Sequence, residues 1–498
     1  MYRQIAASVE AFGDKLAIET DSGERFSYRD LDAQTARYAN VLSAAGLRRG
    51  ERVAVQVEKS PQSLFLYLAC LRAGLVYLPL NVAYQRAELE YFLRDGEPGL
   101  IVGRPQSETL LMELSAATVK ASVLSLDESG GGSLAQRAQG AKTEFDDANI
   151  GDDELAVIIY TSGTTGRSKG AMLSHRNLAS NAAALVSEWG FSERDVLLHA
   201  LPIFHVHGLF VANHCALSSG ASLLWQRRFD PATVIPALAR ATVFMGVPTY
   251  YVRLLGEQAF GHAQCAGIRL FISGSAPLLA DTHREFEART GQRILERYGM
   301  SEAGMITSNP LKGERRAGTV GFPLPGVSLR IADDADTALA PGQIGGIQIR
   351  GDSVFCGYWR MPEKTREEFC ADGWFRTGDV GVIDADGYLA IVGRAKDLII
   401  SGGYNVYPKE VELALDDLPG VAESAVVGIE HPDFGEAVAA AVVVKPGAIL
   451  DEAGLIAALK TRLANFKLPK RILVVDELPR NAMGKVQKNL LRARFRAD

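Results

Sequence analysis

The sequence predicts an α/β protein with two unequal parts: a large N-terminal domain of α/β sheets plus a small β layer, and a small mobile α+β C-terminal domain. Three observations predict this fold. Strand-like and helix-like patterns alternate through roughly the first 300 residues, short strands separated by Gly, Pro and Asp-Gly turns follow, and the pattern resets in about the last hundred residues. At 498 residues the chain is also longer than one hydrophobic core usually serves.

Apolar strand-like runs alternate with helical runs in the first part. Residues 52–58 (RVAVQVE) and 74–80 (GLVYLPL) are predicted strands, and residues 60–73 form a predicted helix between them. Three later strands follow helical segments in the same way: residues 241–248, 268–277 and 293–300. Strand, helix and strand at this spacing predict right-handed crossovers and largely parallel sheets.

The pattern changes near Gly318. Short strands with tight turns between them predict a small antiparallel layer in residues 318–333, 342–351 and 387–394. A helix over 408–418, strands in 423–429, 437–447 and 471–479, and a helix from Asp451 then predict a separate α+β domain. We place the domain boundary between Arg394 and Lys396, which divides the chain into residues 1–394 and 395–498.

Composition and charge exclude several function classes. A net charge of -6 and a pI near 5.9 give no electrostatic reason to expect nucleic acid or an acidic membrane as partner. The five cysteines are scattered without a CxxC, and no HExxH occurs, which predicts a reducing compartment without a zinc site. The N-terminus lacks a signal layout, so we expect a cytoplasmic protein. The longest apolar stretch is broken by Arg72 and Gly74 and is too short for the roughly 20 residues of a membrane span.

A loop of small residues, TSGTTGRSKG at 161–170, follows an apolar strand and precedes a predicted helix at 176–190. Glycines let backbone N–H groups approach an anion, hydroxyls add donors, and Lys169 adds a charge, so the loop suits a polyphosphate. A P-loop is excluded because Lys169 is followed by Gly170, and no dinucleotide-binding GxGxxG opens a helix after a strand. On composition alone, a flexible surface loop is the alternative.

Three further segments carry candidate nucleotide-binding side chains. In ERYGMSEAGM, Tyr298 could stack on a base, Ser301 could donate to a phosphate, and Glu302 could hold Mg²⁺. Asp379 in WFRTGDVG and Arg394 in GRAKD suit ribose hydroxyls. Taken singly, a buried tyrosine and solvated charges explain these residues equally well.

The motifs are far more specific in combination. YTSGTTGRSKG, YGMSE, FRTGD, GRAKDLIISGG and PRNAMGK, in this order and spacing, resemble the acyl-adenylate-forming (AMP-binding) family of acyl-CoA synthetases. The resemblance covers nearly the whole chain. It implies two half-reactions in one site. A carboxylate attacks the α-phosphate of ATP and expels pyrophosphate, and the thiol of coenzyme A then attacks the acyl carbon of the adenylate.

The resemblance implies roles for individual residues. Glu302, with Thr161, would hold Mg²⁺, and Ser301 would contact the α-phosphate. Tyr298 would stack on adenine, and Asp379 and Arg394 would bind ribose. The implied ATP- and AMP-binding residues are Thr161, Ser162, Gly163, Thr164, Thr165, Lys169, Tyr298, Gly299, Ser301, Asp379, Arg394 and Lys485.

Three residues of the C-terminal part have implied roles in catalysis and domain movement. Lys485 would bridge the carboxylate and the α-phosphate during adenylation, where its charge offsets the charge of the transition state. Lys396 stands where the family has its hinge, and Gly403 would line the channel for the pantetheine arm. A lysine acetyltransferase and deacetylase acting on Lys485 are conceivable partners, since loss of the charge would stop adenylation. We otherwise expect only small-molecule partners and a monomer or weak homodimer.

The candidate acid pocket contains an unexpected cation. Arg297 precedes the adenine-stacking tyrosine, where many relatives have a small residue, and a buried guanidinium is costly unless an anion joins it. A second carboxylate on the substrate would meet that need. Arg284 is a second candidate for this contact, and Ser275, His205 and His207 would complete the pocket. The alternatives are that Arg297 turns outward or pairs with Glu296, and that Arg284 is a surface residue.

Details of these segments resemble the malonyl-CoA synthetase subgroup, which activates malonate and often methylmalonate. The quoted matches are LPIFHVHGLFVANH, RLFISGSAPLLADTHRE, LERYGMSEAGMITSNP and LPRNAMGKVQKN. Three other functions stay open. They are an acyl-CoA ligase for a short-chain, medium-chain or aromatic monocarboxylate, an adenylation enzyme that loads a separate carrier protein, and a catalytically inactive adenylate sensor.

Overall fold

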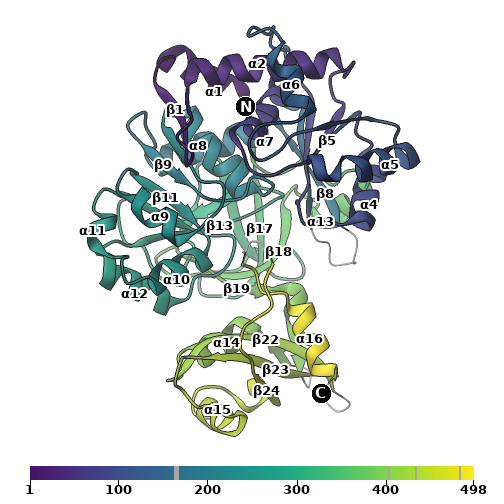
Figure 1. The fold of residues 1–498 in the computed structure, drawn as a ribbon. Coiled ribbons are helices and arrows are strands. Elements are labelled where there is room, and N and C mark those ends of the chain that lie inside the picture. The colour runs from purple at the N-terminus through teal and green to yellow at the C-terminus, as the bar shows by residue number, and fades with distance from the viewer. Residues whose placement is uncertain (162–167, 402–403, 432–434, 482–483, 498) are drawn as a thin grey trace.

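The computed structural model describes residues 1–161, 168–401, 404–431, 435–481 and 484–497. Figure 1 shows the large N-terminal part with a smaller C-terminal part below it, and β18 and β19 lie on the side of the large part that faces the small one. The predicted α/β fold class is confirmed, because parallel sheets flanked by helices form the large part and a mixed sheet with its own helices forms the small part.

The first sheet has six strands. In spatial order they are β6 (Ser122–Ser125), β5 (Leu100–Gly103), β3 (Arg52–Gln56), β4 (Val76–Pro79), β7 (Leu155–Thr161) and β8 (Lys169–Ser174). All neighbours pair in parallel except β7 and β8, which are antiparallel. Both strands predicted within residues 52–80 are therefore central strands of a parallel sheet.

The second sheet has nine strands and carries most of the candidate site. In spatial order they are β15 (Phe322–Pro323), β14 (Gly304–Ser308), β13 (Ile294–Met300), β12 (Leu270–Ser273), β11 (Val243–Gly246), β9 (Val196–His199), β10 (Ser222–Trp225), β1 (Leu16–Thr20) and β2 (Arg25–Ser27). The strands from β13 to β1 are parallel, and the two edges are antiparallel. The carboxyl ends of parallel strands share one edge of the sheet, which is where ligands bind in open α/β sheets.

Helix α3 shows how the sequence sets an element of the core. Ser60 and Ser63 form a reciprocal capping box, Pro61 occupies the first turn, and Gly74 ends the helix at a φ of 67°. Apolar residues surround the helix because both its faces are covered. The α-helices of the large part are α1 (Tyr2–Phe12), α2 (Tyr28–Ala44), α3 (Pro61–Ala73), α4 (Arg86–Gly96), α5 (Glu108–Thr118), α6 (Ser133–Gln139), α7 (His175–Glu188), α8 (Asn213–Ser218), α9 (Pro231–Leu238), α10 (Pro248–Gly256), α11 (His262–Cys265), α12 (Ala280–Thr290) and α13 (Pro362–Glu368).

The predicted β layer is a separate antiparallel sheet. It consists of β16 (Val327–Ala332), β17 (Gly345–Gly351), β18 (Phe375–Ile383) and β19 (Leu389–Arg394). Its register places Asp379 of β18 directly opposite Arg394 of β19. The two candidate ribose-binding residues are therefore neighbours although 15 positions separate them in the chain.

The C-terminal part has its own sheet and its own apolar core, centred on Val411, Val426 and Val442. The sheet contains β20 (Ile399–Ser401), β21 (Tyr404–Val406), β22 (Val421–His431), β23 (Gly435–Val444) and β24 (Arg471–Val474), and the helices are α14 (Pro408–Asp416), α15 (Glu452–Leu459) and α16 (Lys488–Ala497). The helix and strands predicted after residue 408 thus correspond to elements of the structure. The exact boundary after residue 394 stays a prediction.

The glycine-rich loop is followed by a strand that the sequence analysis did not predict. The structure inserts the six-residue strand β8 between the loop and α7, so the loop closes an antiparallel hairpin instead of leading directly into a helix. Thr161 and Lys169 are paired across this hairpin at the two ends of the loop. The hairpin forms because the apolar residues after Lys169 pair with the apolar strand before the loop.

Within the described ranges, no helix combines the length and hydropathy needed to cross a bilayer. The cytoplasmic location stays a prediction.

Candidate active site

Three of the predicted nucleotide-binding side chains form one contiguous cluster. The Tyr298 hydroxyl, at the end of β13, donates to Asp379 Oδ2 at 2.6 Å, and Arg394 Nε lies 3.0 Å from Asp379 Oδ1. Burial, together with the carboxylate of Asp379, raises the pKa of Tyr298. The structure therefore brings the predicted adenine and ribose residues together at the carboxyl edge of the large sheet.

A second cluster surrounds Glu302. This carboxylate is 6% exposed, and the Tyr358 hydroxyl donates to its Oε1 at 3.0 Å. Lys169 Nζ lies 4.1 Å from the centroid of the Tyr358 ring and 3.5 Å from Glu368 Oε1. Burial raises the pKa of Glu302, and the positive charges of Lys169 and Arg394 partly counter this rise.

Tyr358 and Glu368 were not predicted as individual site residues. Tyr358 lies in the segment GYWRMPEKT at 357–365, and Glu368 lies just beyond that segment. The spacing of this motif was the one signal in the sequence that pointed to Tyr358. A tyrosine that follows a glycine gives no indication of the carboxylate that it will contact.

Three other predicted ATP-binding residues, Ser301, Thr161 and Gly299, belong to the described part of the chain. Ser301 is half-buried in the turn after β13, and the Thr161 hydroxyl donates to the Lys169 carbonyl at 3.5 Å. A Cβ at Gly299 would collide with the Gly304 carbonyl, so only glycine fits this approach of two strands. Five predicted residues lie outside the described part of the chain: Ser162, Gly163, Thr164, Thr165 and Gly403.

Lys485 lies on a loop of the C-terminal part that reaches the N-terminal part. A Cβ at the preceding Gly484 would lie 3.0 Å from Thr249 Cγ2 of α10. The surrounding protein lowers the pKa of Lys485 to about 8, with Arg394 contributing by repulsion. Lys485 therefore faces the nucleotide cluster across the boundary between the two parts.

Lys396 lies in the segment that connects the two parts. It belongs to the short turn η3 (Ala395–Asp397), and burial lowers its pKa, assisted by the neighbouring Arg394. Asp397 in the same turn pairs with Arg492 of α16 at 3.0 Å. Rotation at this position stays a prediction.

The candidate acid pocket centres on a buried guanidinium that has no carboxylate partner among the described residues. Arg297 is 4% exposed, and within the same part of the chain its Nε has no hydrogen-bond partner. Its Nη2 lies 3.5 Å from Ser275 Oγ, and a Cβ at Gly274 would collide with the guanidinium. Burial lowers the pKa of Arg297 to about 9, so it stays charged at neutral pH.

Two histidines adjoin this guanidinium. His207 Nδ1 lies 3.4 Å from Ser275 Oγ, and its Nε2 has no partner among the described residues. Burial lowers the pKa of His207, and it lowers that of His205 to about 4 with help from Arg297 and Lys485, so both rings are neutral at pH 7. His207 opens the π-helical turn η2 (His207–Ala212), an irregularity that often marks functional sites.

The alternative partner for Arg297 is directed elsewhere. Glu296 Oε1 lies 3.6 Å from His283 Nδ1 of α12, and adjacent residues of a strand point to opposite faces. Arg284, the second candidate for the acid contact, has an exposed side chain that pairs with Asp281, as the alternative of a surface residue predicts. His283 and Phe286 supply the buried face of α12, which turns Arg284 toward solvent.

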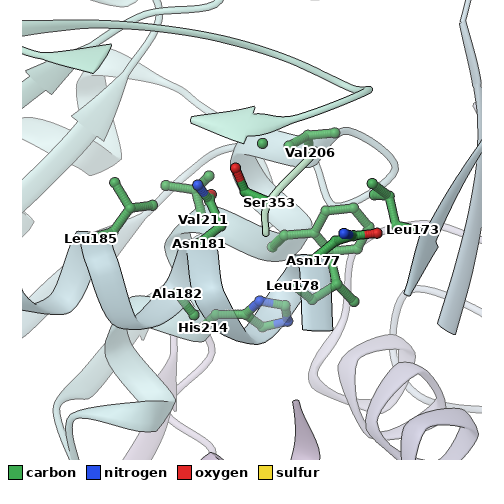
Figure 2. A pocket seen from close by; sticks show the side chains of 12 residues that line it. Leu173, Asn177, Leu178, Asn181, Ala182, Leu185, Val206, Val211, His214 and Ser353 are labelled. Carbon is green, nitrogen blue, oxygen red and sulfur yellow. The ribbon is translucent and has the colours of Figure 1, made fainter. Parts of the chain in front are cut away.

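A small cavity lies between α7 and the segment 206–214. Its volume is about 20 Å³, and Figure 2 shows side chains of α7 and of the segment 206–214 gathered around it. Its lining includes Val206, Phe210 and Gly304, together with His214, whose Nε2 lies 2.9 Å from the Tyr67 hydroxyl. A space of this size holds one water molecule and has no room for an acyl chain.

Sequence comparison identifies both parts of the chain. The profile described as "AMP-binding enzyme" matches residues 5–359, and the profile described as "AMP-binding enzyme C-terminal domain" matches residues 410–485. The chain belongs to the AMP-binding enzyme family. Within this family it is an AMP-forming acyl-CoA ligase that binds ATP and uses coenzyme A.

Relatives within the AMP-binding enzyme family have several substrates. The ATP-bound crystal structure of MatB from Rhodopseudomonas palustris is 53% identical over 99% of both chains, with a TM-score of 0.97. A malonate–CoA ligase from Arabidopsis thaliana is 34% identical over 96% of this chain and 86% of its own length. A feruloyl-CoA synthase from Amycolatopsis sp is 36% identical over 95% of this chain and 94% of its own length.

The site chemistry fits the magnesium ion expected in AMP-binding enzymes. Among the described residues, no group of three or more His, Cys, Asp or Glu side chains could hold a metal ion. Mg²⁺ at nucleotide sites is usually held by one or two carboxylates together with substrate phosphates. The buried Glu302, with its raised pKa, is a single carboxylate of this kind.

Proposed function

We propose that this enzyme ligates a short dicarboxylic acid to coenzyme A through an acyl adenylate, with release of AMP and pyrophosphate. Malonate is the preferred acid, with methylmalonate as a second substrate. The observation that supports this choice is the buried Arg297, whose guanidinium lacks a counter-anion among the described residues. A buried charge is costly unless it is paired, and the second carboxylate of malonate would pair with it.

The arrangement of cations suits a dianion. His205 lies close enough to both Arg297 and Lys485 for each to lower its pKa. An acid bound beside His205 would thus present one carboxylate to Arg297 and the other to Lys485 and the α-phosphate. Ser275 and the neutral His207 would donate or accept the remaining hydrogen bonds.

ATP would occupy the clusters around Tyr298 and Glu302. Tyr298 would stack on adenine, Asp379 and Arg394 would bind ribose, and Lys169 with the glycine-rich loop would bind the β- and γ-phosphates. Glu302 would hold Mg²⁺, which supplies positive charge against the phosphates. The Tyr358 hydroxyl would orient the Glu302 carboxylate, since it already donates to it.

A comparison of acids tests the proposal directly. Coenzyme A consumption with ATP should be measured on acetate, butyrate, benzoate, ferulate, malonate, methylmalonate and succinate. We expect the highest kcat/KM on malonate, with methylmalonate next. A preference for monocarboxylates would contradict the proposal and favour the alternative acyl-CoA ligase. Adenylation without transfer to coenzyme A would favour an enzyme that loads a carrier protein.

Replacement of Gly403 tests the proposed pantetheine channel. We expect Gly403→Leu to lower thioester formation from acyl adenylate by about tenfold or more, because a side chain would fill a channel that binds the reacting arm. ATP–pyrophosphate exchange should stay near the wild-type rate. An equal fall in both half-reactions would mean that Gly403 does not line the channel.

A further inference from the structure

The ammonium of Lys169 is held by side chains outside the glycine-rich loop. It is 3.5 Å from Glu368 Oε1 and lies 4.1 Å from the centroid of the Tyr358 ring, and Lys169 itself is 8% exposed. Thr365 Oγ1 accepts a hydrogen bond from the Tyr358 backbone N–H at 2.9 Å. This contact ties helix α13 to the turn that carries Tyr358, so the two groups that hold the ammonium keep a defined spacing.

Glu368 contacts a second cation. Lys364 Nζ, one turn earlier on α13, lies 3.2 Å from the same Oε1 atom. If Lys169 leaves this carboxylate, Lys364 still neutralises it. The carboxylate can therefore release the Lys169 ammonium without becoming a buried, unpaired charge.

A contribution to the stability of helix α13 does not explain why a glutamate stands at position 368. It is the last residue of α13, where a negative charge is unfavourable with respect to the helix dipole. The preceding Glu367 makes the ordinary surface pair, 3.0 Å from Lys364 with a side chain that is 66% exposed. Glu368 is instead turned toward Lys169, with a side chain that is 22% exposed.

We propose that Glu368 is a positioning residue that competes with the phosphates of ATP and pyrophosphate for the ammonium of Lys169. Before ATP binds, Glu368 and Tyr358 hold the ammonium beside the phosphate site. When the β- and γ-phosphates arrive, the ammonium transfers to them, and Lys364 retains Glu368. When pyrophosphate leaves, Glu368 takes the ammonium back, which weakens the hold on the product. This inference rests on the role of Lys169 in the proposed function.

Removing the charge of Glu368 should tighten phosphate binding. Glu368→Gln keeps the shape and the acceptor oxygen but removes both the competitor for Lys169 and a negative charge near the phosphates. We expect the dissociation constant of magnesium pyrophosphate to fall about three- to tenfold, the range for one partly buried ion pair. The KM for ATP in ATP–pyrophosphate exchange should fall in the same direction. A role confined to helix packing would change the melting temperature and leave both constants unaltered.

The experiment is titration calorimetry of magnesium pyrophosphate into the full-length enzyme, which needs no acid substrate. The matched control is Glu367→Gln, which removes the neighbouring charge on the same helix and should leave the constant within twofold of wild type. A rise or no change with Glu368→Gln, or an equal fall with Glu367→Gln, would overturn the proposal.

A double-mutant cycle with Lys169→Met identifies the route of the effect. We expect Glu368→Gln to change pyrophosphate affinity less than twofold in the Lys169→Met background. If the full effect persists there, Glu368 acts on the phosphates without Lys169 and the inference is wrong. If Lys169→Met alone leaves affinity unchanged, the assignment of Lys169 to the phosphates fails, and the inference fails with it. The choice of malonate as substrate is unaffected by either result.

Discussion

Lys485→Gln is expected to lower the rate of ATP–pyrophosphate exchange by about 100- to 1000-fold, the usual cost of removing one preorganised charge from a transition state. The side chain reaches the nucleotide cluster from the C-terminal part, where Arg394 and the surrounding protein lower its pKa to about 8. Glutamine keeps the reach of the side chain approximately but removes the charge. Thioester formation from chemically prepared acyl adenylate should change less than threefold, because the predicted rotation at Lys396 would withdraw Lys485 from the site before that half-reaction.

Lys460→Gln is the matched control, since this lysine is exposed on the C-terminal part. Its exchange rate should equal that of wild type. Unchanged adenylation by Lys485→Gln would contradict the assigned role. Because acylation also removes the charge of a lysine, we propose that a lysine acetyltransferase and deacetylase acting on Lys485 would switch the first half-reaction off and on.

The lowered pKa of Lys485 also predicts a pH dependence. The ammonium form is present below pH 8 and is lost as the pH rises through about 8. We therefore expect kcat/KM for adenylation, which reports the free enzyme, to fall on the alkaline side with an apparent pKa near 8. A profile that stays flat up to pH 9.5 would contradict this assignment.

Arg297→Met is expected to raise the KM for malonate by about 30- to 1000-fold, corresponding to about 2–4 kcal/mol for the loss of one partner of a buried charge pair. Methionine fills a similar volume without charge, so the loss should come from the missing ion pair. The same change removes an uncompensated charge from the pocket. We accordingly expect the kcat/KM ratio of butyrate to malonate to rise by at least tenfold.

Arg284→Ala is the control for this prediction, because its side chain is exposed and pairs with Asp281 outside the pocket. It should leave the KM for malonate within twofold of wild type. Thermal unfolding of both variants separates a binding defect from a folding defect. If Arg297→Met leaves the KM for malonate unaltered, the second carboxylate is bound elsewhere and the preference for a dicarboxylate loses its main support.

Most of the fold could be predicted from periodicity and turn residues. The strands predicted in residues 52–58 and 74–80 and the helix between them are all present, since the apolar patterns and the Ser60 cap are local signals. Strand β8 was missed. Its residues KGAMLS contain only a short apolar run, and their strand conformation depends on pairing with β7.

The candidate site divides in a similar way. The motifs named Tyr298, Asp379 and Arg394, whose side chains form one cluster in the structure. The motifs could not distinguish Arg297 from Arg284 as the carboxylate-binding residue. That distinction depends on which face of β13 and which side of α12 is buried. Neighbouring helices and strands determine this burial, and a local motif does not describe them.

The sequence by itself determined the family, the two-part α/β architecture and the residue types available for adenylate chemistry, because motif spacing and apolar periodicity are local properties of the chain. Only the tertiary structure decided which side chains meet. It buried Arg297 with no carboxylate partner in the described part of the chain, directed Glu296 to His283, and placed Glu368 beside Lys169 across 199 positions of sequence. Contacts of this range depend on the packing of sheets and helices against one another, and no local pattern records them.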